Sequence, residues 1–423
     1  MAEPIYPQFI SSQQLNAPQM GSTNGEMLTV LDAALITGCC PATASGAVIE
    51  GDFVKITFGV IHPYMLRQFI VIAGATNPAL NGKHRITKVT STEIWIAKGS
   101  ITSTTGTLTV KIAPLGWESI FGTTSPTKRA FRSADPTSSR MVLYLNSEYE
   151  ARVGAHSTKP SQLVKVAICE DMVELGVEIG SVTAAKSDKS APHGFYHFVQ
   201  SASISLGASA PDTPSPWFII GDGKIFYFFV NYMHTYRVTS GKAGYVFGDL
   251  PRVSADDDYP CVFAASEFTW TSSMASANYF VSEIGGFTGR GFTLNPSPLS
   301  YTHTLTGSRT PESLRFLVLT PASVSAPTSG KGIISRLNPF QYGLVYSEAH
   351  ILRGALNLYA GALPYLRYIA TNIPSATESK LLDEVQQGDC IFVQVSAGMG
   401  QAEDNYGLIA IDLETPRVED ETI

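Results

Sequence analysis

Charged residues are scarce in this sequence. Asp, Glu, Lys and Arg make up 15% of its 423 residues, against about 25% in an average soluble domain. No run of Lys and Arg is longer than two residues, and the formal net charge is −7. A protein that follows a nucleic-acid backbone needs clustered cations to displace counterions from the phosphates. The sequence therefore predicts no nucleic-acid partner, and a surface of small polar residues or one that is buried against neighbouring subunits.

Metal-binding and disulfide patterns are also missing. The sequence has an odd number of cysteines and no CxxC motif. The cysteines are Cys39, Cys40, Cys169, Cys261 and Cys390. This spacing predicts neither a zinc site nor a disulfide framework, and buried thiols are the favoured interpretation. His193 and His197 have the spacing of zinc ligands on a helix, but the Glu that a zinc protease needs is absent and Pro192 disfavours a helix. We expect no metal and no cofactor.

Long apolar runs are absent as well. The longest, Trp217–Val230, is interrupted by the sequence Gly-Asp-Gly-Lys and is too short to cross a bilayer. The first residues, MAEPIYPQF, have neither the basic region nor the apolar region of a signal peptide. We therefore expect no membrane partner, and a protein that is made in a cytoplasm and stays soluble or assembles there.

Short runs of β-branched and aromatic residues, separated by turn signals, fill most of the chain. The apolar fraction is 44% and the length exceeds what one core usually serves, so several domains are expected. In the first part these runs are Phe53–Val60, Phe69–Ala75, Arg85–Thr90, Glu93–Ala97 and Gly106–Ala113. They predict a small β-barrel or sandwich over residues 41–113. Asn81–Gly82 predicts a tight two-residue turn within it.

The second part, residues 114–423, predicts a larger antiparallel β-sandwich-like domain, or two units divided near 240–300. Its clearest hairpin is Pro216–Tyr232, in which two apolar runs flank Gly-Asp-Gly. Further strands are expected within Ser139–Ala155, Val166–Met172, Leu314–Ala322, Tyr342–Arg353, Gly388–Ser396 and Tyr406–Leu413. The tail from Arg417 onward is acidic and expected to fray. The predicted fold is thus all-β and multidomain.

Residues 1–40 predict an N-terminal arm with one short helix. Met27, Leu28, Leu31, Ala34 and Leu35 recur at helical spacing, and Gly38 can end the helix. Such an arm packs on its own domain or reaches across to a neighbour, and the sequence does not choose between them. We take Leu28, Leu31 and Leu35 as candidate interface residues.

Candidate sites for ligands or catalysis are weak. Asp256, Asp257 and Asp258, with Asp249 nearby, are the candidates for a cation. Adjacent side chains of an extended chain point in alternate directions, so a solvated acidic loop is favoured over a cation site. The aromatic residues from Trp217 to Phe229 suit either a carbohydrate-stacking surface or a core, and the core is favoured.

The glycine-rich stretch Gly285–Phe292 lacks the spacing of a phosphate-binding loop, and no GxSxG elbow occurs. We assign no catalytic residue and predict that the protein is not an enzyme. Paired carboxylates from distant strands, as a hydrolase of cell-wall polymers would use, stay open at this point.

Several segments contain motifs that have counterparts in one known family. VIAGATNPALNGKHRITKVTSTEIWIA, within Phe53–Ile112, has the pattern GA-x4-LNG followed by VTxVT, which is similar to a small β module. GWESIFGTT, PWFIIGDGKIFYFFV and NPFQYGLVYSEAHILR follow it, and the matches are spread from Leu28 to Leu413. In these motifs and their order the chain resembles a family of structural proteins from the virions of tailed bacteriophages.

This resemblance implies a virion component and carries over no catalytic residues. We expect it to act by protein–protein contacts in the tail, baseplate or neck of the particle. Its partners would be copies of itself, as a trimer or ring, and other virion proteins. The alternatives are a capsid decoration or cement protein and, less favoured, a receptor- or glycan-binding module.

Overall fold

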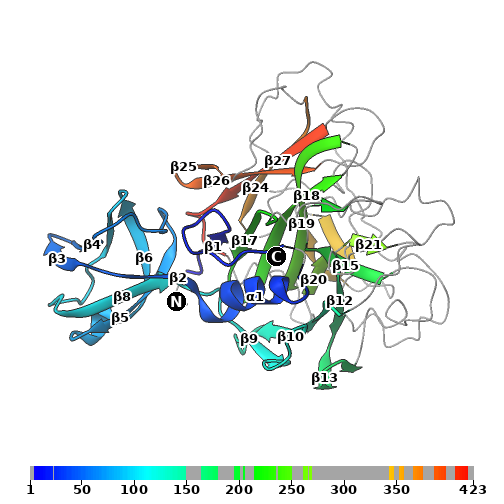
Figure 1. Ribbon diagram of the computed structural model, residues 1–423, viewed down its shortest axis with the longest axis horizontal. Coiled ribbons are helices and arrows are strands. Elements are labelled where there is room, and N and C mark those ends of the chain that lie inside the picture. Colours follow the sequence, from blue (N-terminus) through cyan, green and yellow to red (C-terminus); the bar gives the residue numbers. More distant parts are fainter. Residues whose placement is uncertain are drawn as a thin grey trace.

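The computed structural model confirms the all-β prediction. Strands account for 51% of the residues it describes and helices for 8%. The described residues are 4–21, 23–148, 163–179, 195–200, 203–204, 214–234, 237–249, 261–264, 266–268, 343–346, 352–356, 365–374, 385–396 and 405–417. The chain forms a small module, residues 39–113, beside a larger body (Figure 1).

The small module is a seven-stranded antiparallel sheet that curls into a half-barrel. In sheet order its strands are β2 (Cys39–Thr43), β8 (Gly106–Ile112), β5 (Phe69–Ala75), β6 (Gly82–Val89), β7 (Glu93–Ala97), β4 (Phe53–Thr57) and β3 (Gly46–Glu50). Alternate residues of β4 and β5, such as Val54, Ile56, Ile70 and Ile72, are buried inside. This alternation follows from the two-residue period of a strand.

The connection between β5 and β6 differs from the predicted tight turn. A 3-10 helix, η2 (Pro78–Leu80), makes the reversal, and Asn81 has φ −78° in place of the positive φ that the predicted turn requires. The Asn81 side chain accepts from the Ala75 N–H at 3.0 Å and donates to the Ala75 carbonyl at 2.9 Å. Asn81 therefore stabilises a longer loop, because its side-chain amide forms hydrogen bonds with the backbone of Ala75 in β5.

The body contains two sheets. One has the order β1 (Gln8–Ser11), β17 (Trp217–Gly221), β18 (Ile225–His234), β19 (Arg237–Asp249), β26 (Cys390–Ser396), β27 (Asn405–Asp412) and β24 (Leu366–Pro374), with β16 (Ser203–Ile204), β20 (Cys261–Ala264) and β25 (Val385–Gln387) beside it. The other runs β21 (Ser266–Phe268), β15 (Phe195–Val199), β12 (Leu163–Cys169), β11 (Val142–Asn146), β10 (Lys128–Ser133) and β9 (Trp117–Phe121). Two separate hairpins are β13 (Asp171–Glu174) with β14 (Val177–Ile179), and β22 (Gly343–Tyr346) with β23 (Leu352–Leu356). Pairing is antiparallel except at β16–β18 and β19–β26.

Aromatic side chains join the two sheets of the body. Trp117 of β9 meets Phe226 and Phe247 of the large sheet, with ring centroids 5.2 and 5.6 Å apart. Phe198 stacks on Tyr245 at 4.4 Å. The predicted hairpin at Pro216–Tyr232 is confirmed as β17 and β18. Its aromatic side chains from Trp217 to Phe229 are fully or almost fully buried, so they form core and no carbohydrate-stacking surface.

The N-terminal residues are built into the body. β1 pairs with β17, and the predicted helix is present as α1 (Glu26–Asp32), continued by a π-helix, η1 (Ala33–Thr37). Gly38 ends it with φ +73°, and a Cβ there would lie 2.2 Å from the Ile112 carbonyl oxygen. In Figure 1, α1 lies below the large sheet and beside β9 and β10.

This packing corrects the interpretation of Leu28, Leu31 and Leu35 as interface residues. The three side chains are at most 1% exposed and belong to the chain's own core. Helical spacing shows which residues share a buried face, but not which chain covers that face. The same core continues from α1 into both the small module and the body.

Some predictions fall outside the described residues. They concern the strand at Leu314–Ala322, the second half of Ser139–Ala155 and the loop Gly285–Phe292. Among the described helices, none has the length and apolar character needed to cross a membrane.

Replacing Leu31 by Ala tests the correction to the N-terminal arm. Because Leu31 is 0% exposed within its own chain, we expect L31A to lower the free energy of unfolding of the isolated protein by about 2–5 kcal/mol. Denaturant unfolding measures it. Leu15→Ala is the control, since Leu15 is 53% exposed, and its effect should be small. Equal stability of L31A and the unmodified protein would contradict the packing.

We expect His62 to make the small module sensitive to acid. Its Nδ1 accepts from the Tyr64 N–H at 3.2 Å, so its proton is on Nε2, 3.3 Å from the Glu93 carbonyl oxygen. Burial lowers the pKa of His62, and burial likewise lowers the pKa of His84. The unfolded chain, whose histidines titrate near about 6.5, then binds protons that the folded chain does not. The two histidines therefore do not reduce the free energy of unfolding above that pH, and they reduce it progressively as the pH falls below it.

We expect thermal unfolding scans to show a lower Tm at mildly acidic than at neutral pH. His62→Gln replaces the imidazole by an amide that can also donate and accept but does not titrate, so the Tm of this variant should fall less over the same interval. Adding His84→Gln should reduce the fall further. A pH profile unchanged in both variants would show that other groups cause the acid sensitivity.

Candidate functional site

The described residues contain no metal centre. No group of three or more His, Cys, Asp or Glu side chains among them could hold an ion. Asp256, Asp257 and Asp258 lie outside the described residues, as does His193. His197 is in the strand β15, so the two histidines do not share a helix.

Asp249, the fourth carboxylate considered for a cation, is buried and has a structural role. Its carboxylate accepts from the Ser139 N–H at 2.5 Å and from the Ser139 hydroxyl. Burial raises the pKa of Asp249, and the hydrogen bonds from Ser139 partly offset this effect because they lower the same pKa. Cys39, Cys40 and Cys169 are buried, as expected of structural thiols.

What the structure does assemble is a polar junction between the small module and the body. Its first component is a glutamine seam, made of Gln8, Gln14 and Gln68, none of which is more than 7% exposed. Gln8 donates to the carbonyls of Phe69 and Ala113, at 2.8 and 2.6 Å, and accepts from the Phe69 N–H at 2.8 Å. The side chain of one N-terminal residue thus continues the backbone pairing of β5.

The other two glutamines complete the seam. Gln14 donates to the Pro63 carbonyl at 2.8 Å and to the Gln68 side-chain oxygen at 3.0 Å. Gln68 donates to the Phe9 carbonyl at 2.7 Å. A buried amide with all its partners specifies one arrangement, since any shift of module against body leaves donors and acceptors unpaired.

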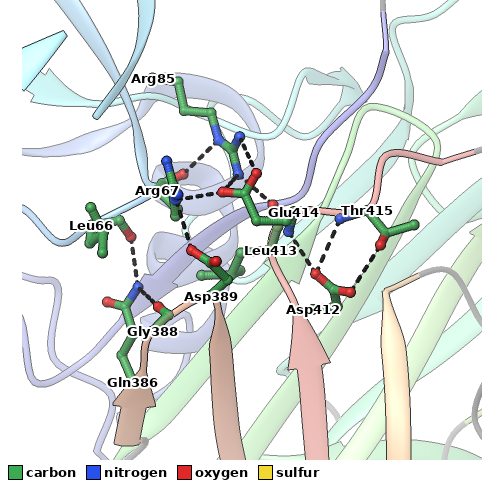
Figure 2. A network of polar contacts seen from close by, with 10 residues as sticks. All are labelled: Leu66, Arg67, Arg85, Gln386, Gly388, Asp389, Asp412, Leu413, Glu414 and Thr415. Carbon is green, nitrogen blue, oxygen red and sulfur yellow. Dashed lines mark hydrogen bonds and ion pairs between the residues drawn. The ribbon is translucent and has the colours of Figure 1, made fainter. Parts of the chain in front are cut away.

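The second component is an ionic network on the rim of the junction. Figure 2 shows Glu414, which follows β27, between Arg67 and Arg85 of the small module. The Arg67 Nε also lies 3.0 Å from the Asp389 carboxylate. Arg85 donates to the Leu413 carbonyl as well, so each arginine bonds two separate residues of the body.

A separate polar cluster lies within the body, around Asp222 at the Gly-Asp-Gly turn between β17 and β18. One carboxylate oxygen of Asp222 accepts from the N–H groups of Lys224 and Ile225, at 2.6 and 2.9 Å. The other accepts from the Tyr365 hydroxyl at 2.5 Å and lies 3.5 Å from Arg417 Nη1. The side chains of Asp222 and Arg417 are 2% and 3% exposed, so this ion pair is inside the protein.

Arg417 connects this turn to both termini of the described chain. Its Nη2 donates to the Asp249 carbonyl at 2.8 Å, and its backbone N–H donates to the Ile5 carbonyl at 2.7 Å. Burial, followed by the negative charge of Asp222, raises the pKa of Tyr365 well above its ordinary value. The expected fraying of the tail is therefore wrong at Arg417, which is buried.

Two surfaces away from the junction expose apolar side chains. The hairpin of β3 and β4 exposes Val48, Ile49 and Phe53 by 48%, 36% and 43%, and the following loop exposes Val60 and Ile61 by 72% and 67%. Val48, Ile49 and Phe53 of this hairpin are called the apolar tip of the small module; Val60 and Ile61 follow the opposite end of β4 and are not part of it. The small hairpin of β13 and β14 exposes Val173, Val177 and Ile179.

Comparisons with known proteins add no family to this description. No protein-family model matches the chain, and no curated protein matches its sequence. The similarity to tailed-phage virion proteins stays a prediction from the motifs quoted above.

No local sequence pattern indicates the junction. The three glutamines stand in polar or mixed segments, where an exposed side chain is the ordinary expectation. Their hydrogen bonds join residues 49 to 105 positions apart, and no local pattern reports that distance. The Gly-Asp-Gly turn at Asp222 is conspicuous in the sequence, but its pattern predicts a hairpin and not the buried cluster around it.

Removing Arg417 should strongly destabilise the protein. Arg417→Met leaves the buried Asp222 carboxylate without its guanidinium partner, a change that costs about 3–5 kcal/mol of unfolding free energy. In Asp222→Asn the amide oxygen still accepts from the turn. The double variant D222N/R417M removes both charges, so its loss should be smaller than the sum of the single losses. Denaturant unfolding of the three variants measures this coupling, and strictly additive losses would refute it.

Proposed function

We propose that the chain is a non-enzymatic structural component of a tailed-bacteriophage virion, which assembles by protein–protein contacts in the tail, baseplate or neck. The ordered motifs from Leu28 to Leu413 support the family. The observation that carries the assembly role is the apolar tip of the small module.

The tip has the properties of a surface that is covered in an assembly. β3 is the last strand of its sheet, its sequence GAVIE has no Pro and Glu50 as its one charged residue, and its register with β4 is unbroken. Monomeric proteins usually protect such edges with charges, prolines or bulges. Contiguous exposed apolar groups on a soluble protein commonly mark interaction sites.

The rest of the molecule supports the same role. A chain with 15% charged residues can be buried against neighbours with few ions to desolvate. The partners we propose are copies of this chain, in a closed trimer or ring, and other virion proteins, with no nucleic acid and no membrane. The alternative of a glycan-binding module loses its main support, since the aromatic residues that suggested it are buried in the core.

A paired substitution at the tip tests the proposal. Val48→Asp with Phe53→Asp should leave the fold intact, because both side chains are exposed. Incorporation into particles should fall at least about tenfold, since burying one such side chain is worth about 1.5–3 kcal/mol. Quantitative mass spectrometry of particles purified after complementation measures the copies incorporated.

Leu15→Asp is the matched control, because Leu15 is an exposed apolar residue outside the tip. This variant should be incorporated normally. Normal incorporation of the V48D/F53D variant would refute the role of the tip. Absence of the unmodified chain from purified particles would refute the virion role itself.

A further inference from the structure

We propose that the segment Asp412–Arg417 is a clamp that holds the small module in one orientation on the body. We further propose that its exposed half opens while both parts stay folded. This inference is independent of where the protein works, because it concerns only the contacts between the two parts.

The exposed half of the clamp is Glu414. Its carboxylate pairs with Arg67 and lies 3.3 Å from Arg85 Nη2, and both arginines belong to the small module (Figure 2). The side chains of Glu414, Arg67 and Arg85 are 36%, 26% and 18% exposed. Water and salt therefore reach this group of ion pairs, which weakens each of them.

The buried half of the clamp is Arg417. It is bound to Asp222 and to the Asp249 and Ile5 carbonyls, all within the body. A buried pair of this kind is little screened by salt. The two halves therefore differ: Glu414 contacts the small module and is weakened by salt, whereas Arg417 contacts only the body and is little affected by salt.

A short turn joins the two halves. The Asp412 carboxylate accepts from the N–H groups of Glu414 and Thr415, at 2.7 and 3.1 Å, and from the Thr415 hydroxyl at 2.9 Å (Figure 2). The Asp412 and Leu413 N–H groups donate to the Tyr365 and Asp389 carbonyls. The body thus fixes the position of Glu414, and the small module supplies Arg67 and Arg85 to it. Beside them, the Leu66 carbonyl of the module accepts from the Gln386 amide of the body at 2.9 Å (Figure 2).

The Phe69 amide reports directly on opening of the junction. Its N–H donates to the Gln8 side chain, which belongs to β1 of the body, although Phe69 itself belongs to β5 of the module. If the module moves away from the body, this amide loses its acceptor and exchanges with solvent. Amides inside the β4–β7 ladder keep their partners in the same event.

Glu414→Gln is the test, because it removes the charge and keeps the size of the side chain. We expect hydrogen–deuterium exchange at Phe69 to be roughly two- to fivefold faster than in the unmodified protein, the change that loss of exposed ion pairs produces. Exchange within β4 and β7 should not change. High salt should accelerate exchange at Phe69 in the unmodified protein and have a smaller effect on E414Q, in which only the Arg67–Asp389 pair of this network is left to screen.

Glu50→Gln is the matched control, since Glu50 forms a 2.6 Å ion pair with Lys55 inside the small module. It should leave exchange at Phe69 unchanged. A second variant, Arg67→Gln, should reproduce E414Q, and the double variant should add little to either. Equal exchange at Phe69 in E414Q and E50Q would overturn the clamp, as would acceleration spread evenly over the β4–β7 ladder, which would mean that the module itself unfolds.

Discussion

The buried carboxylate of Asp222 is the contact on which the arrangement of the body depends. It closes the β17–β18 turn through two N–H groups, and it also receives the Tyr365 hydroxyl and faces the Arg417 guanidinium. The carbonyl of the same residue accepts from the Trp117 indole at 2.8 Å, which brings in the second sheet. A buried charge is tolerated only where its partners are in place. The turn therefore requires segments from both termini and both sheets to meet at one point.

The small module is attached by a different kind of contact. Its barrel side chains merge with the core of the body, but its orientation is specified by polar groups, namely the glutamine seam and the rim around Glu414. Apolar burial favours contact without direction, whereas amide hydrogen bonds require definite angles. For a protein proposed to assemble through the far tip of this module, the polar contacts decide where that tip points.

Local patterns in the sequence predicted individual helices and strands better than the tertiary contacts that these elements make. Helical spacing and Gly38 located α1 and its end, and the Gly-Asp-Gly turn located β17 and β18, because each signal lies within a few neighbouring residues. The Asn81 prediction was wrong because its side chain binds the backbone of Ala75 in place of forming the turn itself. The role of Leu31 was also wrong, since periodicity does not name the covering surface. The glutamine seam and Arg417 depend on tertiary contacts alone.

The separation of these partners along the chain bears on how the protein is made. Tyr365 reaches Asp222 across 143 residues, and Arg417 reaches the Asp249 carbonyl across 168. During synthesis at about 5–20 residues per second, the β17–β18 turn leaves the ribosome many seconds before these groups exist. Until then the Asp222 carboxylate has to remain hydrated, so this end of the hairpin cannot yet be buried. Closure of such distant contacts is slow, so the body can reach its final packing only after the last of these strands has emerged.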